Sequence, residues 1–365
     1  MNKAISPEIR EVMEAVHYRP AVSIILPFEA KMGLKNEVLN SLKSAADKVE
    51  LELLESYPQE LSNIVMLKLR AIITDLDVDT NKKSVAIYVS PVFEKVLFLD
   101  VTIEEKIIVD ESFEIRDLVY SKKQLHKYLV LLWSAKESRM YLGNTNSFVR
   151  IVSTTPESVF AYVNDEPEKV ANFTDSSSRK EIVMNKFLHH IDAELDTVLN
   201  NHPLPIFVLG TDRIMGHFKY ITRHAKSVIE YIHGNYEEAT LPELKAILKP
   251  SIASWDKMKQ RVLLNQLEGA ASNRKLAIGI RDVWRETMNQ RGRLLLVEKN
   301  YMFPAQRGGR EDEIYTAGDA GTKVLYIKDA VDVIIEKVLE NGGDVEFVDP
   351  GVLKDYHQIA LLQYY

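Results

Sequence analysis

The chain has 365 residues, of which 46 are Lys or Arg and 53 are Asp or Glu, so its formal net charge is −7. Hydrophobic residues make up 46% and charged residues 27%, which excludes a wholly disordered chain and predicts two or three domains. The absence of cysteine excludes a disulfide scaffold, a Cys-ligated metal and a thiol nucleophile. No apolar run long enough to span a membrane and no secretory signal is recognisable, so a cytoplasmic location without membrane contact is expected.

Residues 1–124 are predicted to form an α+β domain with an antiparallel sheet. Apolar residues spaced three or four apart predict helices over residues 7–17, 36–56 and 58–75. Apolar runs bounded by turn residues predict strands over residues 21–26, 84–90, 95–101 and 105–110. The second and third of these strands flank Pro91 and are expected to form a hairpin.

Residues 125–239 alternate predicted strands and helices, which indicates an α/β domain with a mixed sheet. Strands are expected over residues 139–142, 148–152 and 206–209, and residues 125–134 are strongly apolar. Helices are expected over residues 178–200 and 211–223. The polar stretch 163–180 between them is predicted to be an exposed loop.

Residues 240–365 are predicted to form a compact α/β/α sandwich. Helices are expected over residues 241–271, with a break or kink at Pro250, over 275–288 and over 327–341, with Gly342 as the C-cap. Strands are expected over residues 293–297, 344–348 and 359–362. Residues 300–323 are predicted to be a long irregular connection.

Candidate binding residues lie in two basic segments. Residues 212–226 are the most basic stretch, and their cations are Arg213, Lys219, Arg223 and Lys226. These four cations predict contact with RNA phosphates, and the alternative interpretation is a charged helix surface without a ligand. Arg291 and Arg293 predict an RNA- or protein-binding edge, or else charges that favour solubility and complement the C-terminus of the preceding helix.

The polar segment 164–180 ends at a predicted helix N-terminus, where backbone N–H groups favour anions. Ser176, Ser177 and Ser178 are candidate caps of this helix. Arg179 and Lys180 in its first turn oppose the helix dipole, which favours an external anionic partner. The alternative is a disordered loop without a role.

Catalytic and metal motifs are weak. No Gly-x-Ser-x-Gly elbow, P-loop or Gly-x-Gly-x-x-Gly motif occurs, so a hydrolase triad and a nucleotide cofactor are not expected. His189, His190, Asp192 and Glu194 contain possible metal ligands. Their spacing does not converge on one helix face, so we interpret them as a solvated helix surface and predict no metal.

The order of these elements resembles the bacterial branch of the archaeo-eukaryotic peptide release factor and Pelota superfamily, which includes the ribosome hibernation factor Balon. The segments that carry the resemblance are residues 111–117, 210–213, 279–284, 292–297 and 342–348. The resemblance implies an N-terminal α+β domain, a ribonuclease-H-like middle domain and an L7Ae-like C-terminal domain. Their predicted bounds are 1–124, 125–239 and 240–365.

The resemblance also implies a ribosome-binding protein that occupies the A site as a transfer-RNA mimic, in hibernation or rescue. Release factors present Gly-Gly-Gln on the middle-domain loop, but residues 164–180 contain no glycine. We therefore expect no catalytic residues, no cofactor and no peptide release. The loop residues expected on the peptidyl-transferase side are Asn172, Phe173, Thr174, Asp175, Ser176, Ser177, Ser178, Arg179 and Lys180. Lys82 and Lys83 are candidate decoding-side contacts or a solvated turn, and an elongation factor Tu-type GTPase is a possible partner.

Two other functions stay open. The first is an RNA nuclease or peptidyl-tRNA hydrolase that uses the middle domain, although its predicted strands carry no carboxylates and only Asp212 follows one of them. The second is a stress-linked protein-interaction module that inherited the fold.

Overall fold

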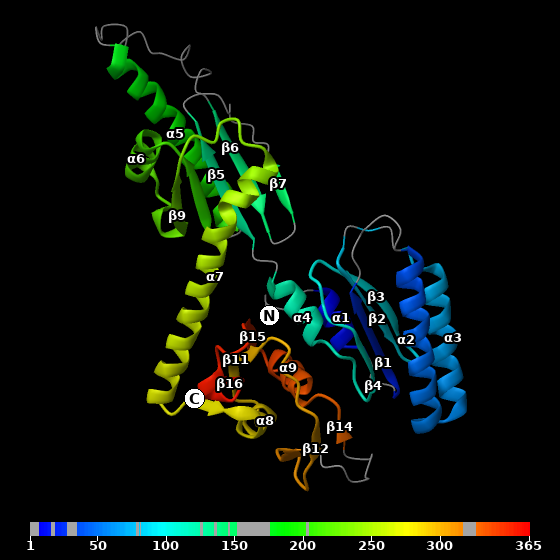
Figure 1. Ribbon diagram of the computed structural model, residues 1–365. Coiled ribbons are helices and arrows are strands. Elements are labelled where there is room, and N and C mark those ends of the chain that lie inside the picture. The colour runs from blue at the N-terminus through cyan, green and yellow to red at the C-terminus, as the bar shows by residue number, and fades with distance from the viewer. Residues whose placement is uncertain are drawn as a thin grey trace. The chain divides into compact units, whose positions relative to one another are not determined.

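A computed structural model of the chain forms two compact units, one of residues 1–124 and 260–365, the other of residues 125–259. Figure 1 follows the elements along the chain by colour. The described residues are 7–15, 19–27, 35–77, 80, 82–124, 127–134, 137–144, 147–151, 176–201, 204–316 and 326–365. Among these residues, no helix combines the length and the apolar character needed to cross a bilayer.

The N-terminal part of the first unit is an antiparallel sheet with the strand order β3-β2-β1-β4. Its strands are β1 (Ala21–Pro27), β2 (Ser84–Val89), β3 (Glu94–Leu99) and β4 (Lys106–Asp110). Helices α2 (Lys35–Ser56) and α3 (Gln59–Asp75) lie side by side and pack Leu53 and Leu69 against one face of this sheet (Figure 1). Because side chains alternate along a strand, Ile24 faces these helices and Ile25 faces a second core.

The C-terminal part of the first unit is a sheet between helices, with the strand order β10-β16-β11-β15. Its strands are β10 (Leu276–Ile278), β11 (Gly292–Glu298), β15 (Asp344–Val348) and β16 (Ile359–Gln363). One face packs on Leu267 near the end of α7 (Leu241–Ser272). The other face packs on α8 (Gly279–Met288) and α9 (Ala330–Glu340), so the predicted α/β/α sandwich is present.

A single hydrophobic core joins the two parts of the first unit. Ile25 and Tyr88 of the N-terminal sheet belong to the same buried cluster as Leu295 and Ile334 of the C-terminal part, and α1 (Pro7–Met13) packs into it. Helix α4 (Arg116–Gln124) begins at this junction. The backbone N–H groups of Ile115 and Arg116 donate to the Asp332 carboxylate of α9 over 2.9 and 2.7 Å. An aspartate of the C-terminal part therefore caps a helix of the N-terminal part.

Buried charges cross the same junction. The Arg116 side chain, which is 2% exposed, lies 2.9 Å from Asp329 and 3.3 Å from Glu114. Its guanidinium also donates to the carbonyl oxygen of Tyr301. Desolvation by burial raises the pKa of Glu114 to about 8 and raises the pKa of Asp332 well above its ordinary value. Since a buried charge without its partner is strongly destabilising, the members of this network depend on one another.

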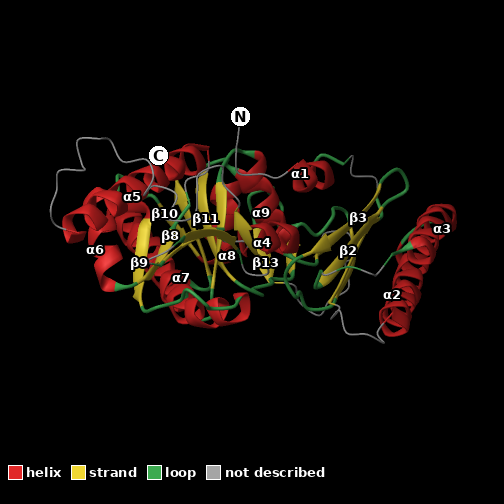
Figure 2. Ribbon diagram, turned by 90° about the horizontal axis from the view of Figure 1, so that it is seen from above, coloured by secondary structure: helices red, strands yellow, loops and turns green. Residues whose placement is uncertain are grey.

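The second unit is a mixed sheet with the strand order β7-β6-β5-β8-β9. Its strands are β5 (Tyr128–Trp133), β6 (Ser138–Gly143), β7 (Phe148–Ile151), β8 (Ile206–Gly210) and β9 (Val228–His233). The strands β5, β8 and β9 are parallel, and β6 is antiparallel to both β5 and β7. Leu131 and Val208 face α5 (Ser176–Asn201) and α6 (Asp212–Ile221), whereas Val130 and Leu209 face the first part of α7. Figure 2 shows α6 and α7 on either side of β9.

The mixed α/β multidomain class predicted from the sequence is confirmed, but several elements differ from the prediction. The helix predicted to begin at Lys275 is preceded by β10, and the connection predicted to be irregular contains β12 (Ala305–Arg307) and β13 (Ile314–Thr316). Residues 326–327, at the predicted start of the last helix, form β14 instead. Helix α4 and strand β9 were not predicted, and α7 continues as one helix through Pro250. Strands of three residues are too short to display the alternation of apolar and polar residues that predicts a strand. Strand β10 forms because it pairs with β16, which lies far along the chain.

Candidate RNA-binding surface

Helix α6 follows β8 and covers one face of the sheet of the second unit. Ile214, Met215 and Phe218 recur every three or four positions and are buried beneath it. The Phe218 ring lies 5.1 Å from the Trp133 ring of β5, between ring centres. Because this stripe fixes the orientation of the helix, the exposed side chains of α6 face away from the core.

The four cations predicted for residues 212–226 lie on α6 or directly after it. Arg213 and Lys219 belong to α6, Arg223 follows its end, and Lys226 lies in the short 3-10 helix Ala225–Ser227. All four are exposed. We call Arg213, Lys219, Arg223 and Lys226 the α6 basic surface.

Two cations of the α6 basic surface are bound to carboxylates of α5. The guanidinium of Arg223 lies 3.0 Å from Asp192 and 2.5 Å from Asp196, and that of Arg213 lies 3.7 Å from Glu181. The hydrogen bond with Asp192, followed by the charge of Asp196, raises the pKa of Arg223. These pairs hold α6 and the segment after it against α5, and they partly neutralise both arginines.

The other two cations keep their charge available. The Lys219 ammonium lies 4.2 Å from the centre of the Tyr231 ring, a cation–π contact that leaves its charge uncompensated. Lys226 is exposed. Within the part of the chain that the structure describes, neither lysine forms an ion pair with a carboxylate. They are therefore the members of the α6 basic surface best able to bind an external phosphate.

The residues that we interpreted as a solvated helix surface differ in their exposure to solvent. His189 and His190 are exposed, as predicted. Asp192 is 1% exposed and accepts a hydrogen bond from the Thr222 hydroxyl over 2.8 Å as well as binding Arg223, so the prediction was wrong for this residue. The reason is tertiary, because α6 packs over this turn of α5. Among the described residues, no group of three or more His, Asp or Glu side chains is placed to hold a metal ion.

The other predicted cations lie in the first unit. Lys82 pairs with Asp100 over 2.8 Å, and Arg291 pairs with Glu286 over 3.0 Å. Lys83 and Arg293 are exposed. Among the residues that the structure describes, only one member of each predicted pair is therefore held by a carboxylate.

The predicted loop on the peptidyl-transferase side is described only in part. Its residues Asn172, Phe173, Thr174 and Asp175 lie outside the described residues. Its residues Ser176, Ser177, Ser178, Arg179 and Lys180 form the beginning of α5. The helix therefore begins two residues earlier than predicted.

Asp212, the carboxylate named for a nuclease, stands at the C-terminal edge of the parallel strands. It follows β8, and its carboxylate contacts the imidazole of His233 at the end of β9. Sequence spacing does not reveal this pair, because 21 positions separate its members and only the pairing of β8 with β9 joins them. Asp212 is 87% exposed and His233 54%, so the pair lies on an open surface.

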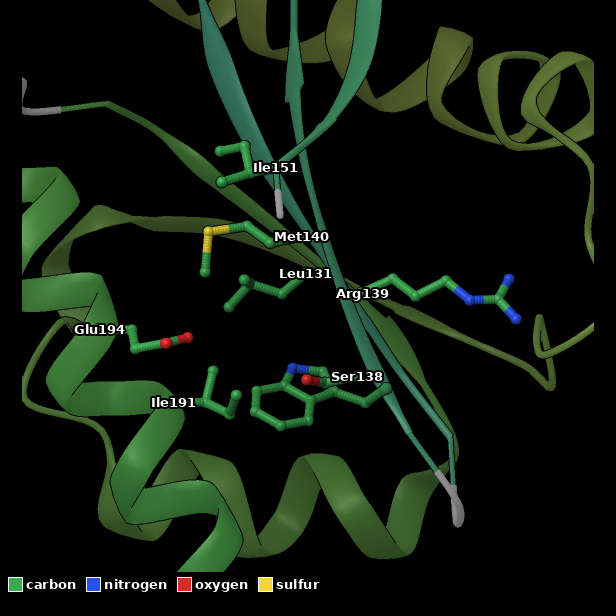
Figure 3. A pocket seen from close by; sticks show the side chains of 8 residues that line it. Leu131, Ser138, Arg139, Met140, Ile151, Ile191 and Glu194 are labelled. Carbon is green, nitrogen blue, oxygen red and sulfur yellow. The ribbon is translucent and has the colours of Figure 1, made fainter. Parts of the chain in front are cut away.

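Two cavities among the described residues do not have the features of a substrate site. A pocket of about 10 Å³ lies between β5, β6 and α5, where Ile191 and Glu194 face Leu131 and Met140 (Figure 3). That volume holds at most a single water molecule. A cavity of about 190 Å³ in the first unit is lined by Lys106, Asp117 and Lys299, but each of these charges is already paired.

Comparison with known proteins identifies the family of the middle segment. Residues 127–291 match the model of bacterial archaeo-eukaryotic release factor family 3. This match confirms the predicted resemblance to the bacterial branch of the superfamily. No curated protein matches the chain.

Several solved structures are similar over most of the chain. Archaeal Pelota, in a model of its ribosome-bound state with ABCE1, is 11% identical with a TM-score of 0.43, covering 100% of this chain and 95% of that chain. Dom34 of S. cerevisiae, a translation termination-like factor involved in RNA quality control and interacting with Hbs1, is 13% identical with a TM-score of 0.41, covering 81% and 78%. The archaeal translation termination factor aRF1 is 11% identical with a TM-score of 0.23, covering 98% and 96%.

Proposed function

Since residues 127–291 match a bacterial archaeo-eukaryotic release factor family, we propose that this chain is a translation factor that binds the ribosome without releasing peptide. The family match is the observation that carries the proposal. The matched segment contains the whole α6 basic surface. The proposed RNA contact therefore lies in the part of the chain whose relatives act in translation.

The charge distribution supports local RNA contact and not a broad polyanion-binding face. The chain has a net charge of −7, so non-specific attraction to RNA is weak. Lys219 and Lys226 nevertheless present uncompensated charges within one short segment. Phosphate contacts of this kind position a protein on RNA, and the shape of the binding site then supplies the specificity.

The absence of peptide release follows from the missing motif. Hydrolysis in release factors uses Gly-Gly-Gln, and residues 164–180 contain neither glycine nor glutamine. Glycine lets a backbone approach a reacting ester closely, whereas serine and aspartate side chains crowd that approach. We therefore assign no catalytic residue to the chain.

More specifically, we propose that the chain occupies the ribosomal A site as a transfer-RNA mimic, in hibernation or rescue. A cytoplasmic location follows from that role. An elongation factor Tu-type GTPase is the protein partner that the family resemblance suggests. Residues 172–180 would then lie on the peptidyl-transferase side of the ribosome.

Co-sedimentation with intact bacterial ribosomes at moderate salt tests ribosome binding. We expect the protein to pellet with ribosomes and to be displaced by transfer RNA that occupies the A site. A protein that stays in the supernatant with ribosomes present would refute the proposal.

A second assay tests the absence of release. Ribosomes that carry a labelled peptidyl-tRNA are incubated with the protein, and a release factor with Gly-Gly-Gln serves as the positive control. We expect no labelled peptide above the buffer background. Release by this protein alone would contradict the proposal.

A further inference from the structure

Tyr220 lies on the outward side of α6 and is 93% exposed, more than any other large hydrophobic residue that the structure describes. It stands opposite the buried stripe of Ile214 and Phe218. At this exposure, packing against the described residues of the second unit does not account for its side chain. Proteins bind unpaired bases by stacking them on exposed aromatic side chains that have cations nearby.

Gly216 lies one turn before Tyr220 on the same outward side of α6. A glycine inside a helix destabilises it relative to alanine, so its presence needs a reason. A Cβ atom placed at Gly216 would have no atom of the described residues outside the backbone of α6 within 4 Å, so no contact among these residues requires the glycine. The bare backbone instead leaves room for a flat group to lie against the helix next to the Tyr220 ring.

Three cations lie near Tyr220 along the chain. Lys219 precedes Tyr220, Arg213 lies two turns earlier on the same side of α6, and Lys226 follows after the helix ends. An apolar protein partner would gain nothing from these charges, whereas a nucleotide presents both a stacking base and a phosphate. The charges therefore favour RNA as the occupant.

We propose that Tyr220 stacks on an unpaired base of RNA while the Gly216 backbone admits the nucleotide and Lys219 and Lys226 bind its phosphates. This inference rests on the proposed function and names the ligand of the α6 basic surface. It requires single-stranded RNA, because the bases of a duplex are stacked on one another and unavailable to a side chain.

The test measures binding of a short fluorescent oligoadenylate by anisotropy, for the full chain and four variants. Loss of one stacked base lowers affinity by about 5-fold to 150-fold. We expect such a loss for Tyr220→Ala and near-normal binding for Tyr220→Trp, which keeps a stacking ring. Tyr365→Ala is the matched control, because Tyr365 is also strongly exposed, at 76%, and lies outside the second unit.

Gly216→Ala separates binding from folding. The added methyl group meets no atom of the described residues outside the helix backbone, so we expect thermal unfolding at the same or a higher temperature. We nevertheless expect weaker binding of the oligoadenylate, because the methyl group occupies the space assigned to the nucleotide. A folded Gly216→Ala variant with unchanged affinity would remove the role assigned to this glycine and overturn the proposal.

Four other outcomes also decide the proposal. It is overturned if the wild-type chain does not bind the oligoadenylate, or if Tyr220→Ala binds it as tightly as the wild type. It is also overturned if Tyr220→Ala weakens only ribosome binding, since Tyr220 then contacts a protein. If the wild type binds the oligoadenylate through Tyr220 but does not pellet with ribosomes, the proposed function fails and this inference stands.

Discussion

Replacing Arg116 by methionine tests whether the two parts of the first unit fold as one. Arg116 is 2% exposed, and Asp329 and Glu114 lie 2.9 and 3.3 Å from its guanidinium. Removing one member of a buried ion pair costs roughly 3–5 kcal/mol, because the remaining carboxylate is left in the core without its partner. For a unit of about 150–250 residues, that loss lowers the unfolding temperature by about 6–20 °C.

The Arg70→Met variant is the matched control. Arg70 makes the same kind of ion pair, 2.7 Å from Glu50, but its side chain is 60% exposed. Such a surface pair is worth about 0–1 kcal/mol, so this variant is expected to unfold close to the wild-type temperature. The double variant Arg116→Met/Asp329→Asn is expected to recover much of the loss, because it also removes the unpaired charge and keeps a residue able to cap α9.

Calorimetry and native-state hydrogen exchange measure these effects. We expect Arg116→Met to lower the protection of β1 and β2 together with that of β11 and β16, since one core contains residues of all four strands. If exchange accelerates in the C-terminal strands and stays unchanged in the N-terminal strands, the two parts are separate folding units and the reasoning is wrong. An Arg116→Met variant as stable as Arg70→Met would refute the assigned role of the buried charges.

Three further predictions concern pH, helix stability and salt. Because the pKa of Glu114 is about 8 in the folded chain against 4.5 as its ordinary value, the folded state binds more protons between these values, and stability falls as the pH rises from 4.5 toward 8. In urea unfolding measured between pH 4.5 and 8, Glu114→Gln should make the free energy of unfolding depend less on pH. An unchanged pH dependence would contradict the raised pKa of Glu114. Gly216→Ala should stabilise the second unit by roughly 0.5–1 kcal/mol in urea unfolding, and a destabilised variant would mean that the space at this position is already filled. Replacing Lys226 by alanine should reduce the slope of log affinity against log salt by about 0.7–0.9 for ribosome or RNA binding, and an unaltered slope would exclude a phosphate contact there.

The sequence predicted the elements that carry long periodic patterns. The apolar stripes of α2, α3 and α5 and the apolar run of β8 were assigned correctly, because a pattern that continues over a whole helix or strand is distinctive. The short strands β10, β12 and β13 were missed, since three residues contain no repeat. Helix α4 was missed for a different reason, because its start is fixed by Asp332 of a distant segment.

The candidate site was also predicted only in part from the sequence. The cations of the α6 basic surface lie close together in the sequence, so composition alone was enough to find them. The sequence did not distinguish Arg213 and Arg223, which are paired with α5, from Lys219 and Lys226, which are not. That difference arises when α6 packs against α5.

The sequence by itself indicated the family resemblance, the class of fold and the absence of Gly-Gly-Gln from residues 164–180, because these depend on residue type and on order along the chain. The tertiary structure decided that the first and last segments of the chain share one core, that Asp192 is buried, and that Tyr220 and Gly216 lie on one outward side of a helix. These features depend on which segments meet in space, and packing between distant residues sets that arrangement.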